Sequence, residues 1–263
     1  MLPEDCPLIA PIFVSHGSPT LIFDDVPARD FLVALGQSLP RPKAILVVSA
    51  HWETNNPAVN AVAVNETIHD FGGFPQILFD QRYPAPGDAA LAQRVAGLIQ
   101  AVGLPVGIDT ARGLDHGAWV PLKLMYPAND IPVLQLSVQT DLGAAHHYRL
   151  GLALRALAEE GVLILGSGSF THDLRSVDWR GNNVAPGWVT DFADWVNAAL
   201  AEGRIEDLLN YRRLAPHAAR NHPTEEHFLP LFVALGAGGT AATSLHQSLT
   251  FSVLRMDAFE FAA

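Results

Sequence analysis

Three apolar runs in this chain each lead into a histidine, and this pattern constrains the fold more than any other feature. The clearest run is ILVV at 45–48, which passes through Ser49 and Ala50 into His51. The other two are 12–14, which leads to His16, and 162–165, which leads through Gly-Ser-Gly to His172. Continuous apolar, β-branched runs are typical of strands buried on both faces of a sheet. Open α/β sheets bind their ligands beyond the carboxyl ends of such strands.

Segments with helical periodicity alternate with the strand-like runs. We expect helices at 27–39, 89–102, 147–160, 189–202, 205–209 and 224–235. We expect strands at 8–14, 61–64, 106–108, 133–137, 162–165 and 249–256, together with the strand that ends at His51, and loops at 68–75 and 112–121. This alternation predicts a three-layer α/β fold, with a central, mainly parallel sheet and helices on both faces.

The composition narrows the class of protein. The chain has 263 residues with 49% hydrophobic content, and no linker-like segment divides it, so we expect one catalytic domain over residues 1–263. A formal net charge of −11 argues against a nucleic-acid partner. The lone cysteine, Cys6, fits a reducing cytoplasm. Neither a signal peptide nor an apolar run of about 20 residues is present, so we expect no membrane partner.

Each candidate histidine has an ordinary alternative, because a buried imidazole can simply be hydrogen-bonded. Left without a partner, it would cost on the order of 1–3 kcal/mol. The candidates are His16, His51, His116 beside Asp115, His172 and His227. Three imidazoles can hold a divalent metal and leave coordination positions open, and a further one could move protons. Glu226 and His227 should not both be ligands, since adjacent residues do not share a helix face. With eleven histidines and one cysteine, any metal should have imidazole or carboxylate rather than thiolate ligands.

Several longer motifs, taken in order, resemble one known family. They are FVSHGSPT, VVSAHWET, HDFGGFP, YPAPG, GLDHGAWVPL, PVLQLS, GSGSFTHDL and HPTEEHFLPLFVALGAG, and they extend from about Pro11 to Gly238. In this order they resemble the DOPA 4,5-dioxygenase-like branch of the class III extradiol ring-cleavage dioxygenases. The resemblance implies an enzyme that opens a catechol-type ring, DOPA-like or another dihydroxyphenyl compound, with O2.

The resemblance also implies a cofactor and a role for each histidine. The cofactor would be Fe(II) for activity, with Zn(II) able to occupy the same site. His16, His51 and His227 would be the metal ligands. His172 would act as acid/base and could be a fourth ligand when zinc is bound, and His116 would line the substrate site. This leaves the regiochemistry open, as well as a monomeric or dimeric state.

The sequence also offers candidate residues for the pocket walls and leaves two alternative functions open. Residues that could line the substrate pocket are Ser15, Trp52, Phe74, Tyr83 and Trp119, although the aromatic ones could equally be core residues. Glu53 could stand behind the ligands without touching the metal. The first rival is a zinc-dependent hydrolase or lyase on the same scaffold. The second is a non-catalytic metal-binding protein.

Overall fold

The computed structural model describes residues 8–180 and 184–262, and its centre is an eight-stranded sheet. The strand order is β4-β3-β5-β2-β6-β1-β10-β7. Strands β5, β2, β6 and β1 run parallel in its middle, whereas β10 and β7 add antiparallel strands at one edge. The bounds are β1 Ile12–Ser15, β2 Ala44–Glu53, β3 Ala58–Asn60, β4 Gly107–Asp109, β5 Val133–Val138, β6 Val162–Gly168, β7 Ala241–His246 and β10 Ala258–Ala262.

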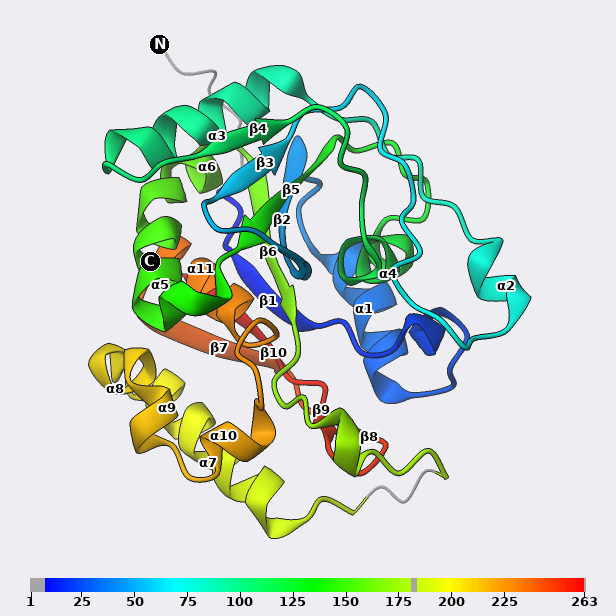
Figure 1. Ribbon diagram of the computed structural model, residues 1–263, viewed down its shortest axis with the longest axis vertical. Helices are drawn as coiled ribbons and strands as arrows, with labels where there is room; N and C mark the ends of the chain where they lie inside the picture. The colour runs from blue at the N-terminus through cyan, green and yellow to red at the C-terminus, as the bar shows by residue number, and fades with distance from the viewer. Residues whose placement is uncertain (1–7, 181–183, 263) are drawn as a thin grey trace.

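Helices cover both faces of the sheet, which confirms the predicted three-layer α/β fold (Figure 1). One face packs against α1 Pro27–Ser38 and α4 His116–Met125. The other carries the larger apolar cluster, formed with α3 Ala89–Ala101, α5 Gly143–Leu154, α7 Gly187–Ala201 and α11 Leu229–Ala237. The shorter helices are α2 Gln76–Phe79, α6 Ala156–Glu159, α8 Ile205–Leu209, α9 Tyr211–Leu214 and α10 Ala218–Asn221. No helix in the described part of the chain is long and apolar enough to span a membrane.

The three histidine-bearing runs become strands β1, β2 and β6 at the centre of the sheet. Strands β1 and β2 are not neighbours, because β6 lies between them and pairs in parallel with both. The β2 strand also continues through His51 to Glu53, with a break in its pairing to β5 after Val48. Side chains from the carboxyl ends of all three strands therefore meet at one edge of the sheet.

Two predictions, one of a helix and one of a loop, were wrong at positions that matter for the site. The helix predicted from residue 224 begins at Leu229, because proline fits best in a helix's first turn and Pro230 lies there. His227 therefore lies in the turn before the helix. The loop predicted at 112–121 is partly helix, since Asp115 caps α4 by accepting the Ala118 N–H, despite the glycine and proline that follow.

The remaining element errors have local causes. The strand predicted at 61–64 ends instead at Asn60, whose side chain bonds to Asn65 and to the Gln135 backbone. The helix predicted at 147–160 divides at Arg155 into α5 and α6. The single strand predicted at 249–256 is wrong: Phe251 has a φ of 52°, which turns the chain between β8 Leu249–Thr250 and β9 Leu254–Arg255.

Candidate metal centre

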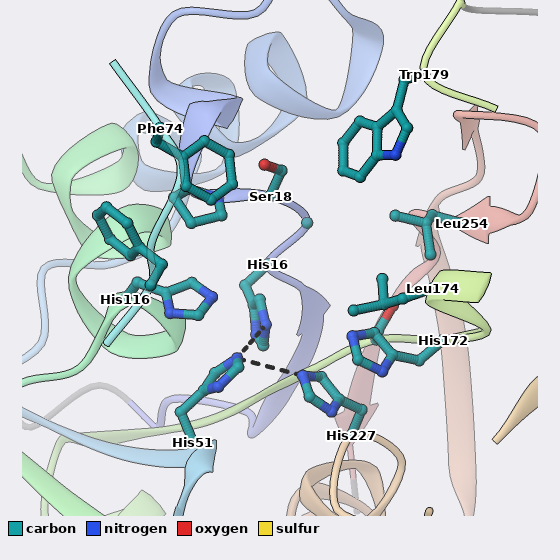
Figure 2. A pocket seen from close by; sticks show the side chains of 14 residues that line it. His16, Ser18, His51, Phe74, His116, His172, Leu174, Trp179, His227 and Leu254 are labelled. Atoms are coloured by element: carbon teal, nitrogen blue, oxygen red, sulfur yellow. Dashed lines mark hydrogen bonds between the residues drawn. The ribbon is translucent and has the colours of Figure 1, made fainter. Parts of the chain in front are cut away.

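A cavity of about 270 Å³ opens where the carboxyl ends of β1, β2 and β6 meet (Figure 2). Five of its lining residues are histidines, which gather at its inner end and are called here the histidine floor: His16, His51, His116, His172 and His227. Three apolar residues on one side of the opening are called the outer wall: Leu174, Trp179 and Leu254. The cavity is also lined by Gly17, Ser18, Pro19, Phe71, Phe74 and Ser169. The structure thus places all five candidate histidines in one cavity.

Three Nε2 atoms converge at the inner end of the cavity. The Nε2 of His51 lies 3.1 Å from the Nε2 of His16 and 3.2 Å from the Nε2 of His227 (Figure 2). These three residues come from β2, from the loop after β1, and from the turn before α11. What such a group can do depends on which nitrogens carry protons.

The opposite nitrogen of His16 is a donor. Its Nδ1 lies 3.1 Å from the Ser167 hydroxyl oxygen. That hydroxyl uses its own hydrogen to donate to the Gly117 carbonyl, so toward His16 it can only accept. A neutral His16 with its proton on Nδ1 has a lone pair on Nε2, and that lone pair is directed into the cavity.

His227 and His51 are oriented in the same way by carboxylates. The Nδ1 of His227 lies 2.8 Å from Glu226 Oε1, and the Nδ1 of His51 lies 3.5 Å from Asp70 Oδ2. Glu226 accepts from His227 Nδ1, so His227 presents a lone pair at Nε2, and the Asp70 carboxylate beside His51 Nδ1 favours the same tautomer of His51. Three lone pairs directed at one another repel unless a cation lies between them. Ligand nitrogens each about 2.0–2.1 Å from an ion such as zinc stand roughly 3.0–3.4 Å apart, and the observed separations match. The donor set therefore fits a divalent metal.

Burial keeps these imidazoles in the neutral form that binds metals. It lowers the pKa of His16 and of His227 well below the usual value, and neighbouring histidines lower both further. Burial, followed by the nearby His116, lowers the pKa of His51 to about 4. Because a protonated imidazole cannot be a ligand, these shifts keep the site ready to bind a cation down to moderately acidic pH.

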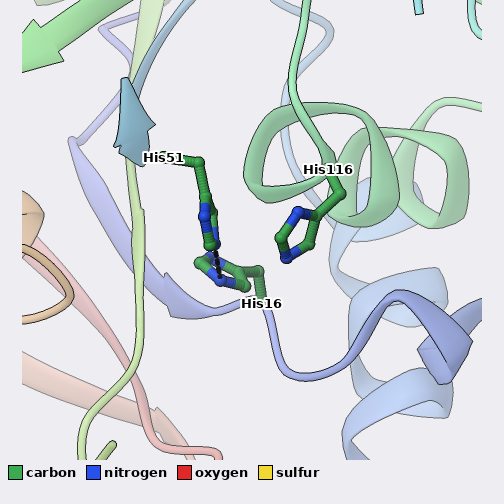
Figure 3. A group of neighbouring side chains, drawn as sticks. All are labelled: His16, His51 and His116. Atoms are coloured by element: carbon green, nitrogen blue, oxygen red, sulfur yellow. Dashed lines mark hydrogen bonds between the residues drawn. The ribbon is translucent and has the colours of Figure 1, made fainter. Parts of the chain in front are cut away.

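His116 begins α4, and its ring faces those of His16 and His51 (Figure 3). Its Nδ1 and its backbone nitrogen both lie 3.0 Å from Asp70 Oδ1, so Asp70 bridges His51 and His116. Burial by itself would raise the pKa of Asp70, but the contacts with His116 and then His51 outweigh it and bring the pKa to about 2. Asp70 is thus a carboxylate that accepts from the His116 backbone N–H and lies beside the Nδ1 atoms of two cavity histidines.

His172 lies beside the converging nitrogens rather than among them. Its ring stacks on that of His227, with centroids 3.4 Å apart and planes 13° from parallel. Burial, followed by His51 and His116, lowers its pKa to about 4, so the ring is neutral near pH 7. A neutral imidazole at the edge of a metal centre can accept a proton from a bound ligand and later return it.

Two glycines allow the floor to pack closely. A Cβ at Gly117 would lie 2.5 Å from Ser49 Oγ and 2.9 Å from His51 Cδ2. A Cβ at Gly168, the last residue of β6, would overlap the His227 carbonyl, which accepts the Ser169 N–H at 2.8 Å. Glycine at these positions lets α4 and the turn before α11 approach the strand ends.

Four of the five predicted wall residues lie elsewhere, and Phe74 alone of the five lines the cavity. The others are fully or almost fully buried. Ser15 bonds to the Asp257 carbonyl, Tyr83 to the Tyr126 carbonyl, Trp119 to the Ile68 carbonyl, and Trp52 packs against Arg112. They are core residues, as the alternative interpretation had it. Glu53 bonds to Thr140 and is exposed, so it does not support the ligands.

The supporting residues were weak signals in the sequence. Asp70, Glu226 and Ser167 hold the Nδ1 atoms of three floor histidines. Glu226 stands next to His227, but the helix predicted there was used only to argue that the two are not both ligands, and the hydrogen bond between them was not foreseen. The outer wall had no sequence signal, because its three residues come from two segments that only the fold brings together.

The same chain features recur in known proteins. The family model described as the catalytic LigB subunit of aromatic ring-opening dioxygenase matches residues 12–256. The "4,5-DOPA dioxygenase extradiol" of Beta vulgaris is 46% identical over 95% of this chain and 96% of its own length. The protein of that name from Escherichia coli strain K12 is 45% identical over 86% of this chain and 84% of its own length.

A solved structure agrees with the fold. The crystal structure of the uncharacterized protein JW3007 from Escherichia coli K12 matches with a TM-score of 0.82 and 37% identity, and the match covers 97% of this chain and 100% of that one. With a family match over most of its length and relatives this similar, the chain belongs to the LigB family of catalytic subunits of aromatic ring-opening dioxygenases.

Proposed function

We propose that this member of the family is an Fe(II)-dependent extradiol dioxygenase that opens the ring of a catechol-type substrate with O2. Membership in the family supports metal-dependent ring opening of a catechol-type aromatic. The observation that carries the proposal is the convergence of three Nε2 lone pairs at the inner end of a largely apolar cavity.

His16, His51 and His227 are the proposed ligands. All three reach the metal position from the inner end of the cavity, so its outward side faces the opening. Three protein ligands on one face suit a non-haem Fe(II) that must also accept both catechol oxygens and dioxygen. When bound, Fe(II) supplies the site that brings the two reactants together and activates them toward each other.

His172 is the proposed acid/base. Its neutral ring faces the cavity beside His227, where it can take a proton from a catechol hydroxyl and return it after ring opening. His116 lies across the floor from His172, and its position suits a hydrogen bond to the substrate. Asp70 keeps His116 and His51 in these orientations.

The test is a reconstitution with each metal in turn. Metal-free protein is loaded with Fe(II) or with Zn(II), and oxygen uptake and the appearance of a yellow ring-opened product are followed across a panel of catechols. We expect turnover with Fe(II) and none with Zn(II). Bound iron without oxygen uptake on any catechol would exclude the proposal, and hydrolytic or lyase activity with zinc would favour the zinc enzyme instead. The similarity to DOPA dioxygenases makes DOPA a required member of the panel.

A further inference from the structure

The chemistry of the cavity changes sharply between the floor and the opening. Among the described residues, the lining carries hydroxyl groups at Ser18 and Ser169 besides the five histidines, and its other side chains are apolar. Phe71 and Phe74 form one side of the opening, with their rings 5.4 Å apart and nearly perpendicular. The outer wall of Leu174, Trp179 and Leu254 forms the other (Figure 2). A substituent that projects outward from a ring bound at the floor would therefore pass between two apolar surfaces.

Trp179 is the unusual member of that wall. Its side chain is 63% exposed, whereas Trp52, Trp119 and Trp188 are buried and Trp195 is partly buried. Within the described part of the chain its ring packs against Phe251, with the two centroids 4.9 Å apart. A large apolar surface left facing a cavity is a common mark of a ligand contact.

The support behind Trp179 keeps it at the opening. Phe251 and Ser252 have φ values of 52° and 64°, a left-handed backbone that non-glycine residues rarely adopt. This turn belongs to the β8–β9 hairpin, which also supplies Leu254 to the outer wall. The hairpin packs with residues around α7 in a small apolar cluster separate from the two main ones: Val177, Ala185, Trp188, Val189, Phe251, Val253 and Leu254. The wall thus has its own apolar packing unit, which is joined to the segment before His172 by the Thr171 hydroxyl, a donor to the Val253 carbonyl.

No lysine or arginine lines the cavity. The undescribed residues, 1–7, 181–183 and 263, include neither lysine nor arginine, so every basic side chain belongs to the described part of the chain. Those nearest in sequence to the outer wall are Arg175 and Arg180, which are exposed, and Arg255, which is paired with Asp257. None of the three is among the lining residues. A carboxylate drawn between the two apolar walls would lose water without gaining a cationic partner, which is costly.

We propose that Trp179 is the residue that determines specificity, and that it selects catechols with an uncharged, apolar ring substituent. The substituent packs between Trp179 and Phe74 while the two hydroxyls face the histidine floor. This inference rests on the proposed function, because it takes a catechol as the ligand. It extends that function by naming the class of substrate and the side chain that recognises it.

The test measures binding without turnover. Fe(II)-loaded protein is titrated under argon with three probes: catechol, 4-propylcatechol and 3-(3,4-dihydroxyphenyl)propionate, of which the last two differ mainly in terminal charge. We expect 4-propylcatechol to bind at least about tenfold more tightly than the propionate. Trp179→Ala should weaken 4-propylcatechol by roughly three- to tenfold and leave unsubstituted catechol within about twofold.

Fluorescence provides an independent readout. Binding of 4-propylcatechol should quench or shift the emission of the wild type, and Trp179→Phe should remove most of that change while keeping an aromatic wall. Trp195→Phe is the matched control, because Trp195 lies on α7 and packs against Arg204 outside the cavity. It should retain the full signal.

Three outcomes would overturn the proposal. These are tighter binding of the propionate, equal losses for catechol and 4-propylcatechol in Trp179→Ala, or no loss in that variant. Because dioxygen is absent, the result is separable from catalysis. Selective binding by iron-loaded protein that then consumes no oxygen in air would refute the dioxygenase proposal and leave the specificity proposal standing.

Discussion

The histidine floor and the outer wall of one cavity are built in different ways. Floor residues come from the ends of central strands or pack directly on them, and Ser167, Asp70 and Glu226 fix the Nδ1 atoms of its three proposed ligands. The outer wall comes from the segment after β6 and from a two-stranded hairpin, supported by a small cluster of its own. The contrast suggests that metal binding depends on a rigid, hydrogen-bonded frame. The proposed choice of substrate depends on apolar contacts of the outer wall, which holds no side chain of the metal centre.

The largest expected effect tests the floor. His16→Ala, His51→Ala or His227→Ala should each lose the bound metal and with it all turnover, because two remaining imidazoles hold a divalent ion poorly. Metal content after dialysis, measured by elemental analysis, checks this. His217→Asn is the control, since His217 lies in an exposed left-handed position that asparagine tolerates, and it should keep the metal. Full metal retention in any of the three alanine variants would remove that residue from the ligand set.

The next effect separates metal binding from proton transfer within the floor. His172→Ala should keep iron but lose turnover by roughly 10²–10⁴-fold, the usual contribution of a general acid–base group. His172→Phe preserves an aromatic ring to stack on His227 and should lose a similar amount. Steady-state oxygen uptake and metal content, measured on the same samples, decide the matter. If both variants also lose iron, His172 is a ligand.

A smaller effect concerns the carboxylates behind the ligands. Glu226→Ala should weaken metal affinity by about 10–100-fold, because it leaves the Nδ1 of His227 without its acceptor. Glu226→Gln retains an oxygen acceptor and should lose less. Competition with a chelator of known affinity measures both. Because the outer wall does not contact the ligands, Leu254→Ala should leave metal affinity unchanged. A loss of metal affinity in Leu254→Ala equal to that in Glu226→Ala would contradict the difference between floor and outer wall.

The last effect is a pH dependence of stability to which the floor histidines contribute together with His147 and His222, whose pKa values burial lowers to about 3. The pKa values of His51 and His172 are lowered to about 4 in the folded chain, against about 6.5 in an unfolded one. Between these values the unfolded chain binds protons that the folded chain does not, so acidification favours unfolding. The metal-free protein should keep its full stability above about pH 6.5. Below that pH it should lose up to about 1.4 kcal/mol per pH unit for each such histidine.

Urea unfolding of metal-free protein at pH 7 and pH 5 measures this dependence. His172→Phe should show a shallower decline, because it removes one of the contributing groups. Trp179→Phe alters only the outer wall, which contains no titratable side chain, and should decline like the wild type. An unchanged slope in His172→Phe would show that the acid sensitivity arises elsewhere.

The sequence by itself determined the central strands, the α/β class and the candidate histidines. Continuous apolar runs such as 45–48 require burial on both faces, and parallel strands bring their carboxyl ends to one edge. These features follow from the local sequence and do not depend on which distant segments pack together. The ordered motifs also indicated the family to which the chain belongs.

The tertiary structure decided which side chains surround the cavity. Because Pro230 lies in the first turn of α11, His227 lies in the turn before the helix, and the carboxylate of its neighbour Glu226 contacts its Nδ1. Trp52, Tyr83 and Trp119 became core, whereas Trp179 and Leu254, 75 positions apart, came to share a wall. Aromatic and aliphatic residues suit a core and a pocket equally well. Their role is therefore set by which distant segments pack together, and no local pattern records that.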